Sequence, residues 1–139
     1  MSNLPGEFEL IARLCQGIRL SRRVILGPSD DCAILAPPRS AQLFTIDSMV
    51  EGVHFRLGWG SARMLGERTM TVNLSDIAAM GGYPTACVVN LAVRATVTTH
   101  VLDELYVGIR AAAKRAAVDV VGGNVTRAAQ LAITIAMLG

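Results

Sequence analysis

The chain has 139 residues, of which 52% are hydrophobic, 17% charged and only 4% aromatic, and its formal net charge is +2. A chain of this length is expected to form one domain with a substantial core, because about two thirds of its unfolded surface is buried on folding. The small positive charge, without a long basic run, argues against nucleic acid as a partner. So apolar a composition in so small a domain predicts that another domain or a second copy covers part of the surface.

The cysteines and the apolar segments indicate where such a chain resides. Cys15, Cys32 and Cys87 lie far apart and form no Cys-x-x-Cys pair, which is typical of a reducing compartment and argues against a disulfide framework and a zinc site. The N-terminus has no continuous apolar core, so it does not resemble a signal peptide. No apolar run approaches the ~20 residues of a membrane span. We therefore expect a soluble, cytoplasmic protein.

The hydrophobic periodicity predicts alternating helices and strands. Ser61 is expected to cap a long helix that ends at Gly81–Gly82. The predicted elements, in chain order, are helix 6–20, strands 32–36 and 42–50, a helix from 62 to about 80, strand 85–95, helix 99–117, a strand with a glycine turn and polar loop over 118–128, and strand 130–138.

The last of these strands is apolar on both faces. Leu131, Ile133 and Ile135 alternate with Ala132 and other apolar residues, so the sheet must be covered twice. The long helices can cover one face only. The fold class expected is therefore α/β (α+β), with a mixed sheet whose second face packs on another sheet, most simply that of an identical chain.

Polar clusters interrupt this apolar chain at four junctions between elements, which is where functional sites usually lie. They fall at residues 27–33, 45–55, 73–82 and 121–128, and they carry Asp30, Asp31, Asp47, Asp76 and Asn124. Carboxylates gathered without lysine raise one another's pKa, so a cluster usually implies a cation. Oxygen ligands without histidine or cysteine favour magnesium or calcium, and magnesium commonly binds together with phosphate oxygens.

Each of these residues also has an ordinary structural interpretation. Asp31 could cap a turn, Asp47 could be solvated, Gly122–Gly123 could form a tight turn, and His54 could be an ordinary loop residue. Asp76 is harder to explain in this way, because an aspartate within an apolar helix is costly if it is buried and unpaired. The chain has no P-loop, dinucleotide-binding loop or nucleophile elbow. If the protein is an enzyme, metal-assisted phosphoryl transfer fits best.

Taken in order, the segments "GEFELIARL", "SDDCAIL", "DSMVEGVHF", "NLSDIAAMGGYP" and "GGNVTR" resemble the amino-terminal domain of the thiamine-monophosphate kinase family. That family belongs to the aminoimidazole-ribonucleotide synthetase-like superfamily. The resemblance implies transfer of a phosphoryl group from ATP to thiamine monophosphate, with Mg²⁺ holding the phosphates. It also implies a homodimer in which two sheets form a barrel, with ATP in a groove at the interface.

The resemblance further implies roles for individual residues, and it requires no protein nucleophile. The substrate phosphate would be contacted by His54, and Tyr106 would approach the nucleotide. Gly122 and Gly123 would let the backbone approach the phosphates. The implied metal ligands are Asp31, Thr45, Asp47, Asp76 and Asn124.

This chain departs from the family pattern in composition and in length. Asn124 stands where the family usually has a metal-binding aspartate, so metal affinity should fall. Ile46 replaces a polar residue, and Ser29 replaces a glycine. The family continues into a carboxy-terminal domain that is absent from this chain, so residues 1–139 are expected to be one ATP- and magnesium-binding domain with little kinase activity alone.

Two further interpretations stay open from the sequence. The chain could come from a diverged member of the superfamily that acts on another acceptor. It could also be a non-catalytic nucleotide-binding or dimerisation domain that kept the fold and lost part of its metal site.

Overall fold

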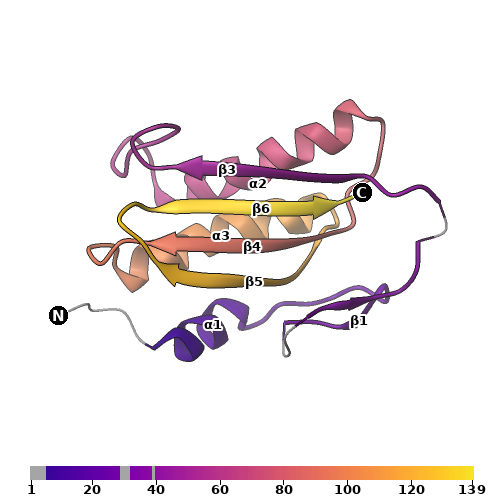
Figure 1. The fold of residues 1–139 in the computed structure, drawn as a ribbon, viewed down its shortest axis with the longest axis horizontal. Helices are drawn as coiled ribbons and strands as arrows, with labels where there is room; N and C mark the ends of the chain where they lie inside the picture. The colour runs from indigo at the N-terminus through magenta and orange to yellow at the C-terminus, as the bar shows by residue number, and fades with distance from the viewer. Residues whose placement is uncertain (1–5, 29–31, 39) are drawn as a thin grey trace.

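The computed structural model describes residues 6–28, 32–38 and 40–139, which form a mixed α/β fold (Figure 1). The elements in chain order are α1 (Glu7–Cys15), β1 (Val24–Leu26), β2 (Ile34–Leu35), β3 (Phe44–Val50), α2 (Ala62–Ala79), β4 (Ala86–Val93), α3 (Thr99–Arg115), β5 (Asp119–Arg127) and β6 (Ala132–Leu138).

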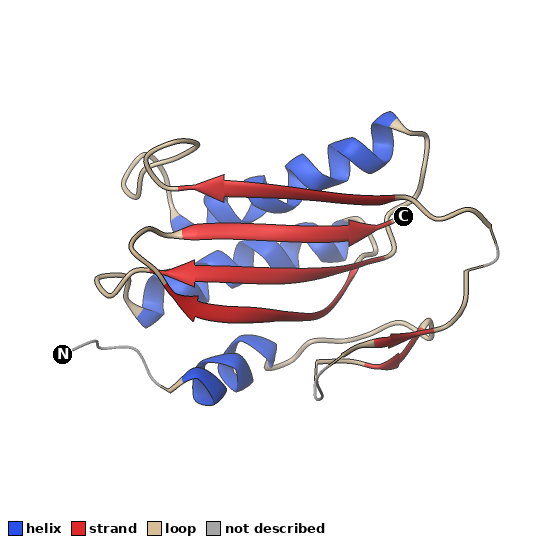
Figure 2. Cartoon of the chain, viewed as in Figure 1, coloured by secondary structure: helices blue, strands red, loops and turns tan. Residues whose placement is uncertain are grey.

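A four-stranded sheet in the order β3-β6-β4-β5 is the centre of the fold. Strand β6 is antiparallel to both β3 and β4, whereas β5 is parallel to β4. Helices α2 and α3 lie side by side behind this sheet, and its front face carries neither of them (Figures 1 and 2). The expected mixed sheet with long helices on one face is confirmed.

Strand β6 shows why the helix-side face of the sheet forms the hydrophobic core. Ile133, Ile135 and Met137 are fully buried against the helices, while the residues between them are half-buried on the front face. This alternation follows from the two-residue period of a strand. The predicted two-faced strand is therefore confirmed, and its helix-side face forms the middle of the hydrophobic core.

The two long helices begin and end where the sequence predicts. The Ser61 hydroxyl accepts a hydrogen bond from the backbone N–H of Met64 at 3.1 Å, which satisfies one of the free donors of the first turn of α2. Gly81, with φ at 70°, ends that helix. Thr98 caps α3 in the same way through the N–H of Val101. Among the residues described, no helix is both long and apolar enough to cross a membrane.

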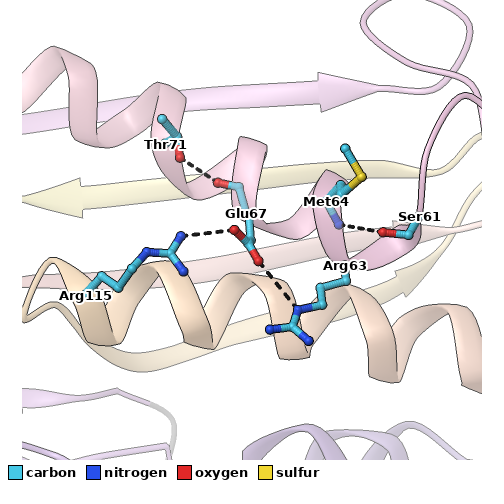
Figure 3. A network of polar contacts seen from close by, with 6 residues as sticks. All are labelled: Ser61, Arg63, Met64, Glu67, Thr71 and Arg115. Atoms are coloured by element: carbon cyan, nitrogen blue, oxygen red, sulfur yellow. Dashed lines mark hydrogen bonds and ion pairs between the residues drawn. The ribbon is translucent and has the colours of Figure 1, made fainter.

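Glu67 connects α2 to α3 on the outer surface (Figure 3). Its carboxylate accepts a hydrogen bond from Arg115 on α3 at 3.1 Å and lies 3.5 Å from the Arg63 guanidinium one turn earlier on α2. These side chains are exposed or half-exposed, so the pairs add little to the free energy of unfolding. They help to align two helices whose contact depends on packing.

Helix α1 is shorter than predicted and lies below β5 (Figure 1). It was expected to continue to residue 20, but it ends at Cys15, and Gly17 follows with φ at 75°. Arg13 donates two hydrogen bonds to Asp103 on α3, at 2.7 and 2.6 Å. These hydrogen bonds hold the pKa of the Asp103 carboxyl below its ordinary value. Helix α1 is thus fixed beside the sheet rather than across its front face.

Strand β5 corrects another prediction. We expected a strand that ends in a glycine turn, but β5 continues through Gly122 and Gly123 to Arg127, paired with β4 along its length. The reason is packing: a Cβ at Gly123 would overlap the backbone oxygen of Val89 in β4. The glycine permits close approach of two strands, not a reversal of the chain.

A partly buried ion pair gives a test of stability against pH. Arg94 donates to both oxygens of Glu51 at 2.7 and 3.1 Å, and these bonds lower the pKa of Glu51 below its ordinary 4.5. The stabilisation is therefore present above about pH 4.5 and is lost as the pH falls through the lowered pKa. We expect Arg94→Met to reduce the free energy of unfolding by about 1 kcal/mol at pH 7.

Urea denaturation at pH 7 and at pH 3 measures this difference. Arg127→Met is the matched control, because Arg127 makes no ion pair with any residue that the structure describes. The loss should shrink at pH 3 for Arg94→Met only. An equal loss at both pH values would show that the Arg94 stem, rather than the ion pair, stabilises the fold.

Candidate functional site

A groove of about 940 Å³ opens between the front of the sheet, α1 and the β1–β2 hairpin. Its walls are mostly apolar, with Phe8 and Ile11 from α1, Leu35 from β2 and Phe44 from β3 among them. Gly122, Gly123 and Asn124 of β5 and the side chain of Tyr106 also line it. A cavity of this size, mainly apolar with a few polar groups, is typical of a small-molecule site.

The glycines of β5 lie at an edge of the sheet that no other described strand covers. An edge strand presents backbone N–H groups that lack a sheet partner. A Cβ at Gly122 would meet only a methyl carbon of Val88 at 3.7 Å, an ordinary contact. Packing therefore explains the glycine at 123 but not the one at 122. Close approach of a ligand to the backbone would explain Gly122.

Asn124 lines the groove and is hydrogen-bonded across the sheet. Its side-chain amide donates to the Oδ1 atom of Asn90 on β4 at 3.0 Å, so its own carbonyl oxygen is left to accept another donor or a cation. Asn90 also lines the groove and was missed from the sequence. The available signal was a single polar residue inside the apolar run "ACVVNLAV".

Tyr106 projects from α3 into the inner wall of the groove. Only 6% of the residue is exposed, and burial raises the pKa of its hydroxyl above the ordinary value. It can therefore offer a neutral hydroxyl and an aromatic ring to a bound molecule. Its predicted contact with a nucleotide stays a prediction.

Asp76 lies on the helix side of the sheet. The Thr45 hydroxyl on β3 donates to its Oδ2 atom at 2.6 Å. Strand alternation places Asp47 on the same side of β3 as Thr45, two residues further along. The half-buried Asp76 carboxylate is thus held by a threonine hydroxyl, and its second oxygen has no hydrogen-bond partner among the described side chains.

A neighbouring residue supplies a buried oxygen without a partner. Asn73, one turn before Asp76 on α2, is fully buried, and its amide donates to the backbone oxygen of Thr69 at 3.2 Å. Its Oδ1 atom accepts no hydrogen bond, which is costly in a protein interior. The Thr45 hydroxyl and the Asp76 carboxylate, which are in contact, are oxygen donors of the kind that magnesium prefers. No three acidic, histidine or cysteine residues gather in the described part of the chain, so phosphate oxygens would have to complete the shell.

His54 lies in the turn after the far end of β3. Its Nδ1 atom accepts a hydrogen bond from the backbone N–H of Val50 at 3.1 Å, which leaves Nε2 free to donate. The adjoining small hollow contains Arg56, Arg68 and Trp59. Trp59 is 73% exposed beneath the Arg56 guanidinium.

The structure therefore brings the predicted residues together in three separate places. Tyr106, Gly122, Gly123 and Asn124 meet at the groove. Thr45 contacts Asp76 at the β3 edge, on the other side of the sheet, Asp47 lies two residues further along β3 on that same side, and His54 lies beyond the end of β3. Asp31 and Ser29 lie outside the described residues.

Curated proteins similar to this chain are thiamine-monophosphate kinases. The protein from Bacillus subtilis (strain 168) is 36% identical over 135 residues, which cover 96% of this chain and 42% of that protein. The protein from Mycobacterium tuberculosis (strain H37Rv) is 32% identical over 134 residues, covering 96% and 40% of the two chains. The chain thus spans about two fifths of the length of these relatives.

Solved structures agree with this similarity. Thiamine-monophosphate kinase from Stenotrophomonas maltophilia K279a matches 95% of this chain and 40% of its own, with a TM-score of 0.76 and 29% identity. The AaThiL complex with AMPPCP and TMP matches 70% of this chain and 31% of its own, with a TM-score of 0.69 and 28% identity. The model for "AIR synthase related protein, N-terminal domain" matches residues 29–139. The chain accordingly belongs to the AIR synthase related protein family, in the part that forms the N-terminal domain.

Proposed function

We propose that this chain is the ATP- and magnesium-binding domain of a thiamine-monophosphate kinase. The observation that carries the proposal is the groove, because it combines a large apolar wall with the glycine edge of β5 and the oxygen of Asn124. The apolar wall suits a nucleobase, and the unpaired backbone N–H groups beside Gly122 suit phosphate oxygens. The complex of a relative with AMPPCP, a non-hydrolysable ATP analogue, and TMP supports the same assignment.

Magnesium in this proposal is held by Asp47 and by Asp76, which Thr45 contacts. The unpaired oxygen of Asn73, one turn earlier on α2, is a further candidate ligand. When bound, the metal would neutralise charge on the phosphate oxygens during transfer. Thr45 orients the Asp76 carboxylate through its hydroxyl. The His54 Nε2–H is available to donate to an acceptor phosphate. The protein itself need supply no nucleophile, since the phosphate of thiamine monophosphate attacks ATP.

We also propose that the chain works in the cytoplasm as a homodimer through the front face of the sheet. Phe44 and Ile46 on this face are 70% and 61% exposed, which is unusual for an antiparallel face in contact with water. A twofold axis along the strands would lay the β3 edge of one copy over the β5 edge of the other. That arrangement would bring Asp47 and Asp76 of one copy towards the groove of its partner.

The residues that complete phosphoryl transfer can lie beyond this part of the protein, because the chain spans about two fifths of its relatives. We therefore predict little formation of thiamine diphosphate by the 139-residue chain alone. Robust ATP-dependent formation by the purified chain would contradict this prediction.

Gly122→Val tests the nucleotide site. A Cβ at this position would make only an ordinary contact with Val88, and valine suits a β-strand, so the fold should remain. The added side chain would keep phosphate oxygens from the backbone. We expect the Kd for AMPPCP with Mg²⁺, measured by isothermal titration calorimetry, to rise at least about tenfold, the loss of roughly 1.4 kcal/mol of binding energy.

Ala92→Val is the matched control, because Ala92 lies on the same sheet face and does not line the groove. It adds a similar bulk to the face and should leave the Kd unchanged. If Gly122→Val bound AMPPCP as tightly as the wild type, the groove would not be the nucleotide site.

A further inference from the structure

The exposed part of the front face of the sheet carries no charge. Asp119, at the start of β5, pairs with Ala86 on this face, but only 6% of it is exposed and its carboxylate accepts hydrogen bonds from Ser21. The other side chains that strand alternation directs to this face, all within the described residues, are aliphatic, aromatic or uncharged polar groups. Val88 at its centre is 41% exposed. A charged partner would find no complementary charge on this exposed surface. A second copy of the chain, in contrast, presents the same uncharged surface.

One row of polar side chains crosses this face from edge to edge. Ser48 on β3 pairs with Thr134 on β6, Thr134 pairs with Asn90 on β4, and Asn90 pairs with Asn124 on β5. The Ser48 and Thr134 hydroxyls are 2.7 Å apart, and Asn124 donates to Asn90 at 3.0 Å. The front-face residues on both sides of this row are apolar or glycine, except Thr126 near the end of β5 and the buried aspartate at its start. We call these four residues the polar row.

The polar row keeps unused hydrogen-bonding capacity towards the front. Each hydroxyl and each amide is both a donor and an acceptor, and the two hydrogen bonds within the row use only part of this capacity. Water can satisfy the remainder while the face is open. Once the face is covered, every remaining donor and acceptor needs a partner. Groups that both donate and accept can pair with a copy of themselves, as a twofold interface requires.

We propose that the polar row fixes how two copies of this chain align when their sheets pack face to face. In some of the dimers that a twofold axis allows, the polar row of one copy faces the polar row of the other, and the buried hydroxyls and amides form hydrogen bonds with each other. In the other dimers, Asn90 or Asn124 faces alanine or valine of the second copy, and its amide is left without a hydrogen-bond partner. A buried asparagine sets the register of coiled coils by the same principle. The inference rests on the homodimer of the proposed function, and it adds what selects one dimer among many.

The Asn90→Leu/Asn124→Leu double variant tests the row. Sedimentation velocity gives the oligomeric state, and ¹H–¹⁵N correlation spectra report on the glycine amides next to the row. The wild-type 139-residue chain should be a single dimer with one set of glycine resonances. The variant should associate at least as tightly, because its face is more apolar, but it should lose its single alignment and show several sets of resonances or species larger than a dimer.

Two further variants make every outcome decisive. Ser48→Ala/Thr134→Val alters the other half of the row and should also multiply the resonances, which covers the case in which the leucine variant does not fold. Ile46→Asp places a charge on the apolar part of the face and should give monomers. A double variant that stays one dimer with one set of resonances overturns the role of the row alone. A wild-type monomer overturns the row and the proposed homodimer together, while AMPPCP binding by the wild-type chain reports separately on the nucleotide site.

Discussion

Replacing Asp76 with asparagine is expected to weaken Mg²⁺-dependent AMPPCP binding by at least about tenfold, while the fold stays intact. Asparagine keeps an oxygen that can accept the 2.6 Å hydrogen bond from Thr45, so β3 and α2 should remain joined. The lost negative charge is the one that a divalent cation needs. Isothermal titration calorimetry with and without Mg²⁺ measures the effect.

Glu104→Gln is the matched control for Asp76→Asn. It also removes one carboxylate charge from a long helix, but Glu104 does not line the groove and makes no ion pair with the described residues. It should leave binding unchanged. If both variants weakened binding equally, net charge rather than metal ligation would explain the result. If neither did, Asp76 would not be a metal ligand.

Gly66→Ala is expected to reduce the free energy of unfolding by roughly 3 kcal/mol, the upper part of the range for overpacking. Helix propensity alone predicts the opposite, a gain of about 1 kcal/mol, because alanine favours helices over glycine. The packing of α2 on α3 decides the sign. A Cβ at Gly66 would overlap the backbone oxygen of Leu105, and one at Gly108 would overlap that of Arg63.

Urea denaturation distinguishes the two expectations for Gly66→Ala. Gly60→Ala serves as the control, since a Cβ there would meet only the side chain of Met64, at 3.8 Å or more. It should change the free energy of unfolding by no more than about 0.5 kcal/mol. A Gly66→Ala protein as stable as the wild type would show that the two helices can separate at no cost.

The sequence pattern predicted those helices and strands whose bounds depend on neighbouring residues in the chain. Ser61 and the Gly81 turn set the ends of α2, and the alternation of Ile133 and Ile135 identified a strand with two apolar faces. The error over β5 arose because Gly-Gly predicts a turn from local propensity. The contact that requires Gly123 is with Val89, in a neighbouring strand. A contact between distant segments leaves no periodic pattern.

The candidate site shows the same limit. The residue types in the acidic clusters indicated oxygen ligands for a cation, but the pairing of Thr45 with Asp76 depends on how α2 packs on β3. The hydrogen bond between Asn124 and Asn90 depends on the register of two strands. The sequence also gave no indication that Asp76 and Asn124 would lie at opposite edges of the sheet, because edge position follows from strand order.

A crystal structure with AMPPCP and Mn²⁺ in place of Mg²⁺ tests most directly whether this domain binds a metal nucleotide. The anomalous signal of manganese locates the cation independently of the protein atoms. We predict a manganese peak within ligand distance of the Asp47 and Asp76 carboxylates, and the nucleotide phosphates along the Gly122 edge of β5 in the same or the neighbouring copy. A nucleotide bound away from that edge, with no manganese at either aspartate, would contradict the proposed function.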